Sequence, residues 1–167
     1  KAPLPLAVRR RLNALSRSNI SNVQTQEKLS NHIIIIGYGI NGQNLAKAAR
    51  YANIPHVILE LDPDAYQEAK VNKEPVIFGD AMDETILKHA HIQEARVVVI
   101  AISDPDSTKK IIDNVRRFSE TTYLMVRTRY VKDIDELIRL GADDVIPEEF
   151  ETSIEIFSKV LKKYLVT

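Results

Sequence analysis

Three of the five glycines in the chain form a motif that can bind phosphate. Gly37, Gly39 and Gly42 make the segment G-Y-G-I-N-G directly after the apolar run Ile33–Ile36. A turn from a buried strand into a helix exposes backbone N–H groups at the positive end of the helix dipole, where a phosphate group is stabilised. Gly37 lets the chain turn, Gly39 lets phosphate approach the backbone, and Gly42 lets the helix pack on the strand. The motif therefore predicts nucleotide binding rather than an ordinary strand–helix connection.

An acidic residue follows the next apolar run. Glu60 lies 18 residues beyond Gly42, near the end of the run His56–Leu61. A carboxylate at this place can accept hydrogen bonds from both ribose hydroxyls, and it repels a 2′-phosphate. NAD or a plain adenosine nucleotide is therefore favoured over NADP. Asp62 is the alternative, but it precedes Pro63 and is better placed to cap a helix.

Further candidates follow the third and fourth apolar runs. Asp80 and Ala81 come after Val76–Phe78, on the adenosine side of the expected cleft, although Asp80 also suits an Asx turn within its loop. Ser103 comes after the fourth run and is expected near the phosphates. Asp104, which precedes a proline, is better placed as a helix cap than as a ligand-binding residue.

Two arginines follow the fifth run. Arg127 and Arg129 alternate around Thr128, so only one of them can face the ligand if the segment stays extended. An arginine there would give phosphate a forked, charge-assisted hydrogen bond, and Arg127 is our choice. The predicted ligand-binding residues are Gly37, Tyr38, Gly39, Ile40, Asn41, Gly42, Glu60, Leu61, Asp80, Ala81, Ser103 and Arg127.

The elements that must position these residues alternate regularly between strand and helix. Strands are expected at His32–Ile36, His56–Leu61, Val76–Phe78, Val97–Ile102, Tyr123–Val126 and Asp144–Ile146. Helices are expected at about 41–53, 62–72, 83–90, 104–118, 133–140 and 151–165. Six such alternations predict an α/β, Rossmann-like, doubly wound parallel six-stranded sheet with helices on both faces. Ligands of these sheets bind beyond the carboxyl ends of the strands, where all the candidates above lie.

Composition divides the chain into two unequal parts. The 23 basic residues balance the 23 acidic ones, so a nucleic-acid partner is not indicated. Residues 1–31 hold a basic stretch and then a segment rich in Ser, Asn and Gln. We expect a linker here, either a solvated tail or a connector from a membrane domain, and a nucleotide-binding domain over residues 32–167. The first residue is lysine, which suggests a fragment of a longer protein.

The residue types that catalysis or metal binding would require are scattered or missing. The chain has no cysteine, and its four histidines are dispersed. His89 and His91 stand two apart at a helix end, which puts their rings on different faces, so no metal site is expected. No serine occupies a nucleophile elbow. We therefore expect no catalytic residues and no enzyme.

The motifs together resemble a known family. The segments His32–Gly42, Glu60–Asp64, Gly79–Ala81 and Leu140–Asp143 resemble the RCK/KTN (TrkA-N type) domains that regulate potassium transport. The Pro- and Arg-rich start resembles, more loosely, the segment that joins the membrane part of Kef-type potassium efflux antiporters to that domain. The resemblance covers residues 32–166 with specific motifs.

The resemblance implies a regulatory domain at the cytoplasmic face of the cell membrane that forms homodimers and acts on a membrane transport domain. Members bind NAD(H), AMP, ADP or ATP, and the glycines, Glu60, Asp80 and Arg127 fall on the family's nucleotide positions. Many relatives carry a basic residue inside the glycine motif, where this chain has Ile40 and Asn41. We therefore expect AMP or NAD(H), with ADP and ATP less favoured. Some Kef systems respond to glutathione, but no pocket for a thiol adduct is identifiable in the sequence.

Alternatives remain for the packing of the last expected helix and for the function of the protein. In related domains this helix helps to hold two subunits together, and the apolar residues of Glu151–Leu165 suit that role or packing on the chain's own sheet. Three other functions remain open. They are a peripheral NAD-binding subunit of a separate potassium channel or transporter, a fragment of an NAD-dependent oxidoreductase, and a nucleotide held permanently for structural reasons.

Overall fold

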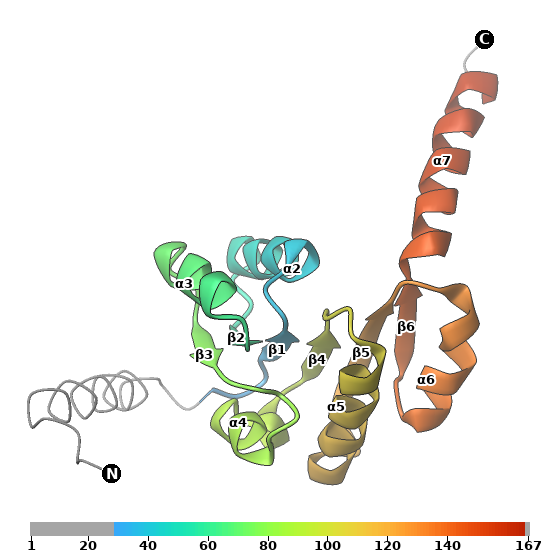
Figure 1. The fold of residues 1–167 in the computed structure, drawn as a ribbon. Helices are drawn as coiled ribbons and strands as arrows, with labels where there is room; N and C mark the ends of the chain where they lie inside the picture. Colours follow the sequence, from blue (N-terminus) through green and yellow to red (C-terminus); the bar gives the residue numbers. More distant parts are fainter. Residues whose placement is uncertain (1–28, 166–167) are drawn as a thin grey trace, which may run out of the picture.

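The computed structural model describes residues 29–165, which form one parallel sheet flanked by helices (Figure 1). The strands are β1 (Ile33–Ile36), β2 (His56–Glu60), β3 (Val76–Phe78), β4 (Val97–Ile100), β5 (Tyr123–Thr128) and β6 (Asp144–Pro147). The helices are α2 (Ile40–Tyr51), α3 (Pro63–Val71), α4 (Glu84–His89), α5 (Pro105–Phe118), α6 (Ile134–Leu140) and α7 (Glu148–Leu165), with 3-10 turns η1 (Ile92–Glu94) and η2 (Val131–Asp133). The basic stretch expected near the N-terminus lies outside the described residues.

The strand order confirms the predicted doubly wound fold. The sheet runs β3-β2-β1-β4-β5-β6, so the chain builds one half outward from β1 and then returns to build the other half from β4. Ile33 of β1 pairs with His56 of β2 on one side and with Val97 of β4 on the other, all in parallel. The order therefore reverses at β1, and the turn that follows β1 lies where such sheets bind ligands.

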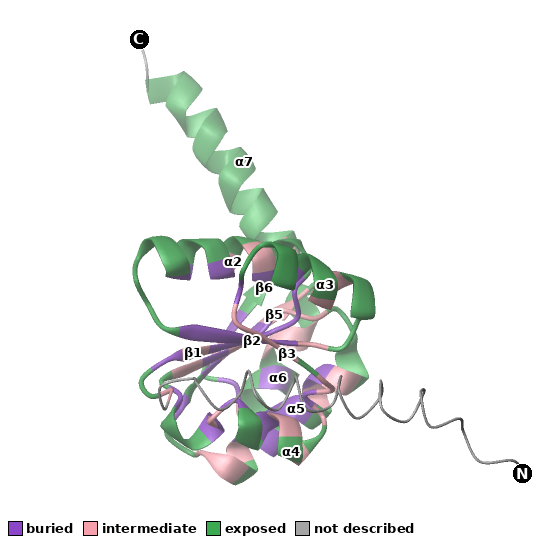
Figure 2. Ribbon diagram, turned by 90° about the vertical axis from the view of Figure 1, so that its left-hand side faces the viewer, coloured by how far each residue is buried: buried purple, intermediate pink, exposed green. Residues whose placement is uncertain are grey.

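Alternating side chains of the central strands supply two separate cores. Ile34 and Ile36 pack with Leu87, Ile112 and other residues of the face that α4, α5 and α6 cover. Ile35 points the other way and packs with side chains from α2 and α3. Burial on both faces explains why this strand is an unbroken run of isoleucines rather than an alternating pattern, and Figure 2 shows it buried.

Asp62 and Asp104 begin α3 and α5, two of the helices that follow strands. The Asp62 carboxylate accepts hydrogen bonds from the backbone N–H groups of Asp64 and Ala65, and Asp104 accepts one from Ser107. The hydrogen bonds from Ser107 lower the pKa of Asp104, because they stabilise its ionised form. Both aspartates thus act as the helix caps that the sequence predicts.

The carboxyl-terminal part of the chain departs most from the predicted boundaries. Strand β5 continues to Thr128, and β6 continues to Pro147, its partner in register. Helix α7 begins directly afterwards at Glu148, three residues earlier than predicted. Its first turn holds several acidic residues, which the helix dipole stabilises.

Helix α7 has no buried residue and extends away from the sheet (Figures 1 and 2). Its apolar side chains, Phe157 among them, therefore do not pack on the chain's own sheet, which was one of the two alternatives for this helix. None of the helices in residues 29–165 combines the length and apolar composition needed to cross a lipid bilayer.

A buried histidine at the start of β1 joins the sheet to α4. The Nε2–H of His32 donates to the carbonyl oxygen of Ala90 over 2.8 Å, and its Nδ1 is buried without a partner. Burial lowers the pKa of His32 below its ordinary value of 6.5, because the charged ring would lose its hydration. The folded state therefore favours the neutral imidazole.

We predict that His32 makes the fold less stable in mild acid. Below about pH 6.5 the His32 ring takes up a proton in the unfolded chain more readily than in the folded chain. Protonation therefore favours the unfolded state, and stability that the fold has above this pH is lost as the pH falls. The free energy of unfolding should fall with a slope of up to about 1.4 kcal/mol per pH unit from this group. Urea unfolding over a pH series should show this slope reduced in His32→Gln and retained in His89→Gln, an exposed control. Parallel curves for the native chain and His32→Gln would contradict the assignment.

Candidate nucleotide-binding site

The glycine turn joins β1 to α2 at the point where strand order reverses. Gly37 has a φ of +100°, which a residue with a side chain rarely adopts, and its N–H donates to the carbonyl oxygen of Leu59. A Cβ atom on Gly42 would lie 1.9 Å from the carbonyl oxygen of Gly37. These two glycines are therefore required by the turn itself.

Gly39 differs from its neighbours because the fold does not require it. Its φ is −70°, which any residue can adopt, and a Cβ atom there would meet no heavy atom within 4 Å. It is the N-cap of α2, a position where Ser, Asp or Asn usually caps the helix. The missing side chain leaves the helix N-terminus open, and an approaching phosphate group would need that space.

Glu60 ties the glycine turn to the end of β2. One oxygen of its carboxylate, Oε2, accepts the Tyr38 N–H over 2.6 Å, and Oε1 accepts the N–H groups of Leu61 and Asp62 over 2.7 Å each. A carboxylate has about four acceptor sites, so a ribose hydroxyl would find at least one of them free. The sequence predicted an acid that binds ribose, and it did not predict that the same acid would hold the turn.

The side chains of the turn lie in different environments. The Tyr38 ring is buried in the core beside α2 and α3, and its hydroxyl accepts a hydrogen bond from Asn72 over 3.2 Å. Ile40 is exposed, as is Leu61 at the end of β2. The Tyr38 ring and N–H are therefore both engaged within the protein, whereas Ile40 and Leu61 offer apolar surface at the edge of the site.

Asp80 and Ala81 border a small cavity beside Glu60. This cavity has a volume of about 80 Å³ and lies beyond the ends of β1, β2 and β3. Asp80 also accepts the Met82 N–H over 2.8 Å, the Asx turn that the sequence left as an alternative. The structure confirms the Asx turn, and a role of Asp80 in binding the adenosine side of a ligand stays a prediction.

Arg127 reaches the predicted phosphate side, where it meets a carboxylate that the sequence did not single out. Its Nε donates to Oε1 of Glu148 over 2.7 Å, its Nη2 donates to the same oxygen, and its Nη1 donates to Ser103 Oγ over 3.1 Å. Asn41 of the glycine turn donates to that oxygen over 3.3 Å. These hydrogen bonds, with Arg127 as the main cause, lower the pKa of Glu148 below its ordinary value.

Glu148 could have been found from its position alone. It comes directly after β6, at the same edge of the sheet as Glu60, Asp80, Ser103 and Arg127. The candidate ligand-binding residues chosen from the sequence end after the fifth strand, because the sixth is short and no familiar motif follows it. The structure therefore gathers three predicted residues, Asn41, Ser103 and Arg127, around one additional acid.

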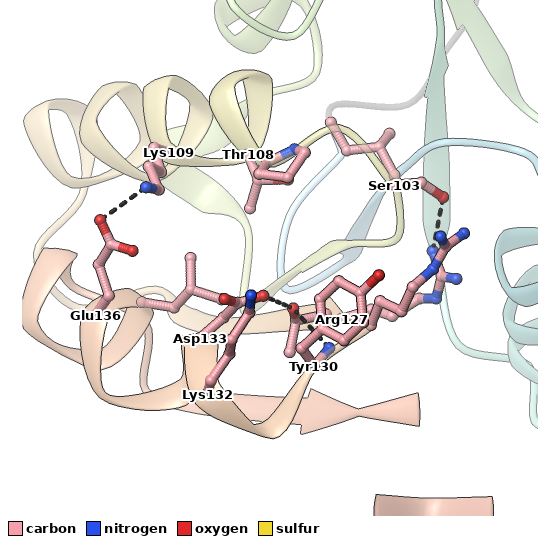
Figure 3. Close-up of a pocket in the computed structure, with 13 residues that line it drawn as sticks. Ser103, Thr108, Lys109, Arg127, Tyr130, Lys132, Asp133 and Glu136 are labelled. Atoms are coloured by element: carbon pink, nitrogen blue, oxygen red, sulfur yellow. Dashed lines mark hydrogen bonds and ion pairs between the residues drawn. The ribbon is translucent and has the colours of Figure 1, made fainter. Parts of the chain in front are cut away.

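A larger cavity lies on the other side of Arg127, between α5 and the segment from η2 to α6 (Figure 3). Its volume is about 330 Å³, and Ser103 and Arg127 stand on its border. Lys109 pairs with Glu136 over 2.7 Å across it, which raises the pKa of Lys109, and Thr128 donates to Asp133 over 2.9 Å. A pocket of this size suits a small organic ligand.

Both arginines line this larger cavity, whereas only one of them was expected from the sequence to face the ligand if the segment stayed extended. That expectation required an extended segment, but β5 ends at Thr128 and the chain turns before Arg129. In residues 29–165 no group of three or more His, Cys, Asp or Glu side chains is arranged to hold a metal ion.

The comparison with known proteins decides the family. Residues 33–148 match the family described as the TrkA-N domain. The chain belongs to the TrkA-N domain family. The match begins at β1 and ends at Glu148, so it spans every strand of the sheet and all the predicted ligand-binding residues.

Relatives of this TrkA-N domain include potassium transport proteins. It is 30% identical over 136 residues to the putative K(+) efflux antiporter KefB of Alkalimonas amylolytica, covering 81% of this chain and 21% of the antiporter. It is 32% identical over 123 residues to potassium channel protein 1 of Methanocaldococcus jannaschii, covering 72% of this chain and 37% of the channel. The chain thus spans about a fifth and somewhat over a third of these relatives.

Solved structures share the fold. The Shewanella denitrificans Kef C-terminal domain in its AMP-bound form superposes with a TM-score of 0.69 at 23% identity, covering 82% of this chain and 83% of that one. The GsuK channel bound to NAD gives a TM-score of 0.65 at 20% identity, covering 73% of this chain and 22% of the channel. Two neighbours of this fold thus carry nucleotides, one a mononucleotide and one a dinucleotide.

Proposed function

We propose that this TrkA-N domain binds AMP or NAD(H) at the glycine turn and thereby regulates a potassium transport protein of the Kef type. The observation that carries the proposal is Gly39, whose open helix N-terminus the fold does not require. Arg127, which donates to Ser103 and reaches Asn41 of this turn through Glu148, can receive a phosphate group, and Glu60 and Asp80, which border one cavity, can receive the ribose. The domain acts by binding and not by catalysis.

The charges around the site favour a ligand with few phosphates. Arg127 is the cation that we expect to meet the phosphate, and it already shares its charge with Glu148. The turn itself carries Ile40 and Asn41, so the glycine motif contributes no cation of its own to balance a triphosphate. AMP would bring one phosphate to this place. NAD would span from the cavity beside Glu60 to the larger cavity beside Thr128, which has room for a second nucleoside.

We further propose that the domain forms a homodimer through α7. Phe150, Ile154, Phe157, Leu161 and Tyr164 are all exposed, and they recur at alternating spacings of four and three residues. This spacing places them in one stripe, as in the seam of two packed helices. An exposed apolar stripe of this length indicates a protein partner, and a second copy offers the same stripe in return.

The sheet offers a second apolar surface on which a protein partner could pack. Val99, Met125 and Ile146 point away from the core that α4, α5 and α6 cover, and within the described residues the opposite core holds no side chain from β4, β5 or β6. Arg127 is paired with Ile146 and shares that face. A partner packed against α7 and this half of the sheet would therefore lie beside the predicted phosphate site, so that ligand binding and the dimer arrangement could influence each other.

In the complete protein, we propose that the dimer lies at the cytoplasmic face of the membrane, with residues 1–31 as the link to the transport part. The partner is the membrane domain of the same polypeptide or a separate channel subunit. A nucleotide would act by binding more tightly to one dimer arrangement than to the other, because equal affinity for both would shift nothing.

The ligand is tested by thermal unfolding with AMP, NAD, NADH and NADPH. Ligand at about 100 times its dissociation constant should stabilise the domain by about 2.7 kcal/mol, which raises the unfolding temperature by about 5–10 °C. We expect this rise with AMP or NAD(H) and not with NADPH.

The matched variant is Gly39→Asp, which should lose the rise in unfolding temperature while folding at least as well as the native chain. Aspartate is a favoured N-cap, and nothing lies within 4 Å of its Cβ position, but its carboxylate would occupy the phosphate side. An unchanged response in Gly39→Asp would contradict the site. No response in any chain would contradict nucleotide binding, once mass spectrometry of the denatured protein had shown no co-purified nucleotide.

The dimer is tested by sedimentation velocity of the chain with one charge placed in the α7 stripe. Phe157→Lys should raise the dimer dissociation constant at least about thirtyfold, because each copy would bury an unpaired charge in place of an aromatic ring. Ile156→Lys is the control, since Ile156 is equally exposed on the same helix but lies outside the stripe. A native chain that stays monomeric, or equal effects of both substitutions, would contradict the proposal.

A further inference from the structure

Two of the predicted ligand-binding residues are engaged with an acid of the protein itself, and a third contacts one of them. Arg127 and Asn41 both donate to Oε1 of Glu148, and Ser103 accepts from the remaining side of the same guanidinium. The Arg127 side chain is largely buried, with 18% of its surface exposed, while that of Glu148 is 39% exposed. Glu148 therefore provides an anion at the edge of the place where the proposed nucleotide would bring its phosphate.

A carboxylate and a phosphate require the same donors. Both bind a guanidinium through two parallel N–H···O hydrogen bonds, and Arg127 already directs two of its nitrogens to Glu148. A phosphate at the turn would either replace this carboxylate on Arg127 or lie beside it. Two anions that share one cation at close range repel each other, so the two states compete.

The competing acid is the first residue of α7, the helix proposed to form the dimer. Its neighbour Glu149 makes separate contacts: its N–H donates to the carbonyl oxygen of Arg129 over 3.3 Å, and its Oε2 accepts the Val131 N–H over 3.2 Å. The base of α7 thus has one attachment to the phosphate side through Glu148 and another to η2 through Glu149. Only the first would respond to a phosphate.

We propose that Glu148 is a built-in competitor for the nucleotide's phosphate, and that phosphate binding transfers Arg127 from Glu148 to the ligand and frees the first turn of α7. This inference rests on the proposed function, because it requires a nucleotide at the glycine turn. It names the contact through which occupancy of that site reaches α7. It also makes Glu148 a residue that sets affinity for the phosphate and not for the nucleoside.

The affinity test compares AMP with adenosine, which lacks the phosphate, by calorimetric titration of the chain. Glu148→Gln keeps the size of the side chain and removes its charge, so it should bind AMP at least about tenfold more tightly while its affinity for adenosine stays unchanged. Glu149→Gln, the matched control on the same turn, should change neither. An unchanged or weaker affinity of Glu148→Gln for AMP, or an equal gain for adenosine, would overturn the inference.

A failure of the proposed function can be distinguished from a failure of the inference about Glu148. If neither AMP nor adenosine binds any of the chains, the proposed function fails and the inference fails with it. If both bind the native chain and Glu148→Gln alters neither affinity, only the inference fails.

The release of α7 is tested by amide hydrogen exchange of the segment 148–152. In the native chain AMP should speed exchange in this segment and adenosine should not, because only AMP removes Arg127 from Glu148. In Glu148→Gln exchange should be fast without ligand and insensitive to AMP. Exchange that AMP slows or leaves unchanged in the native chain would overturn the proposed coupling.

Discussion

The packing of β1 on both of its faces is the constraint on which the rest of this TrkA-N domain depends. Its isoleucines support α4, α5 and α6 from one side and α2 and α3 from the other, and the strand lies between β2 and β4. The glycine turn is therefore the exit of a strand that is packed on both faces and paired on both edges. A turn anchored in this way keeps its N–H groups fixed before any ligand arrives, which lowers the cost of binding.

Acidic side chains at the strand ends have two different structural roles in this site. Glu60 and Asp80 accept backbone N–H groups of their own loops, so they stabilise the loops that carry them. Glu148 instead accepts from side chains that come from α2 and β5, so it links elements far apart in the sequence. Glu60 and Asp80 therefore fix the shape of the site. Glu148 forms a contact with Arg127 that a ligand phosphate could replace.

The sequence was sufficient for most of the fold because each strand and helix carries a local signal. Unbroken apolar runs marked the strands, and Asp62 and Asp104 marked helix starts that the structure confirms. The sequence was insufficient where the deciding contact lies between distant segments. The pairing of Arg127 with Glu148 joins residues 21 positions apart, and Arg129 lines the cavity because β5 ends at Thr128. The place of α7 was also undecided, because its apolar stripe suits an intramolecular or an intermolecular surface equally well.

The most direct measurement is a crystal structure of the chain with AMP. The account predicts that the phosphate lies at the Gly39 opening with Arg127 bound to it, that the ribose hydroxyls meet Glu60, and that Glu148 has left Arg127. AMP bound elsewhere, or a glycine turn that stays empty at saturating AMP, would contradict the account.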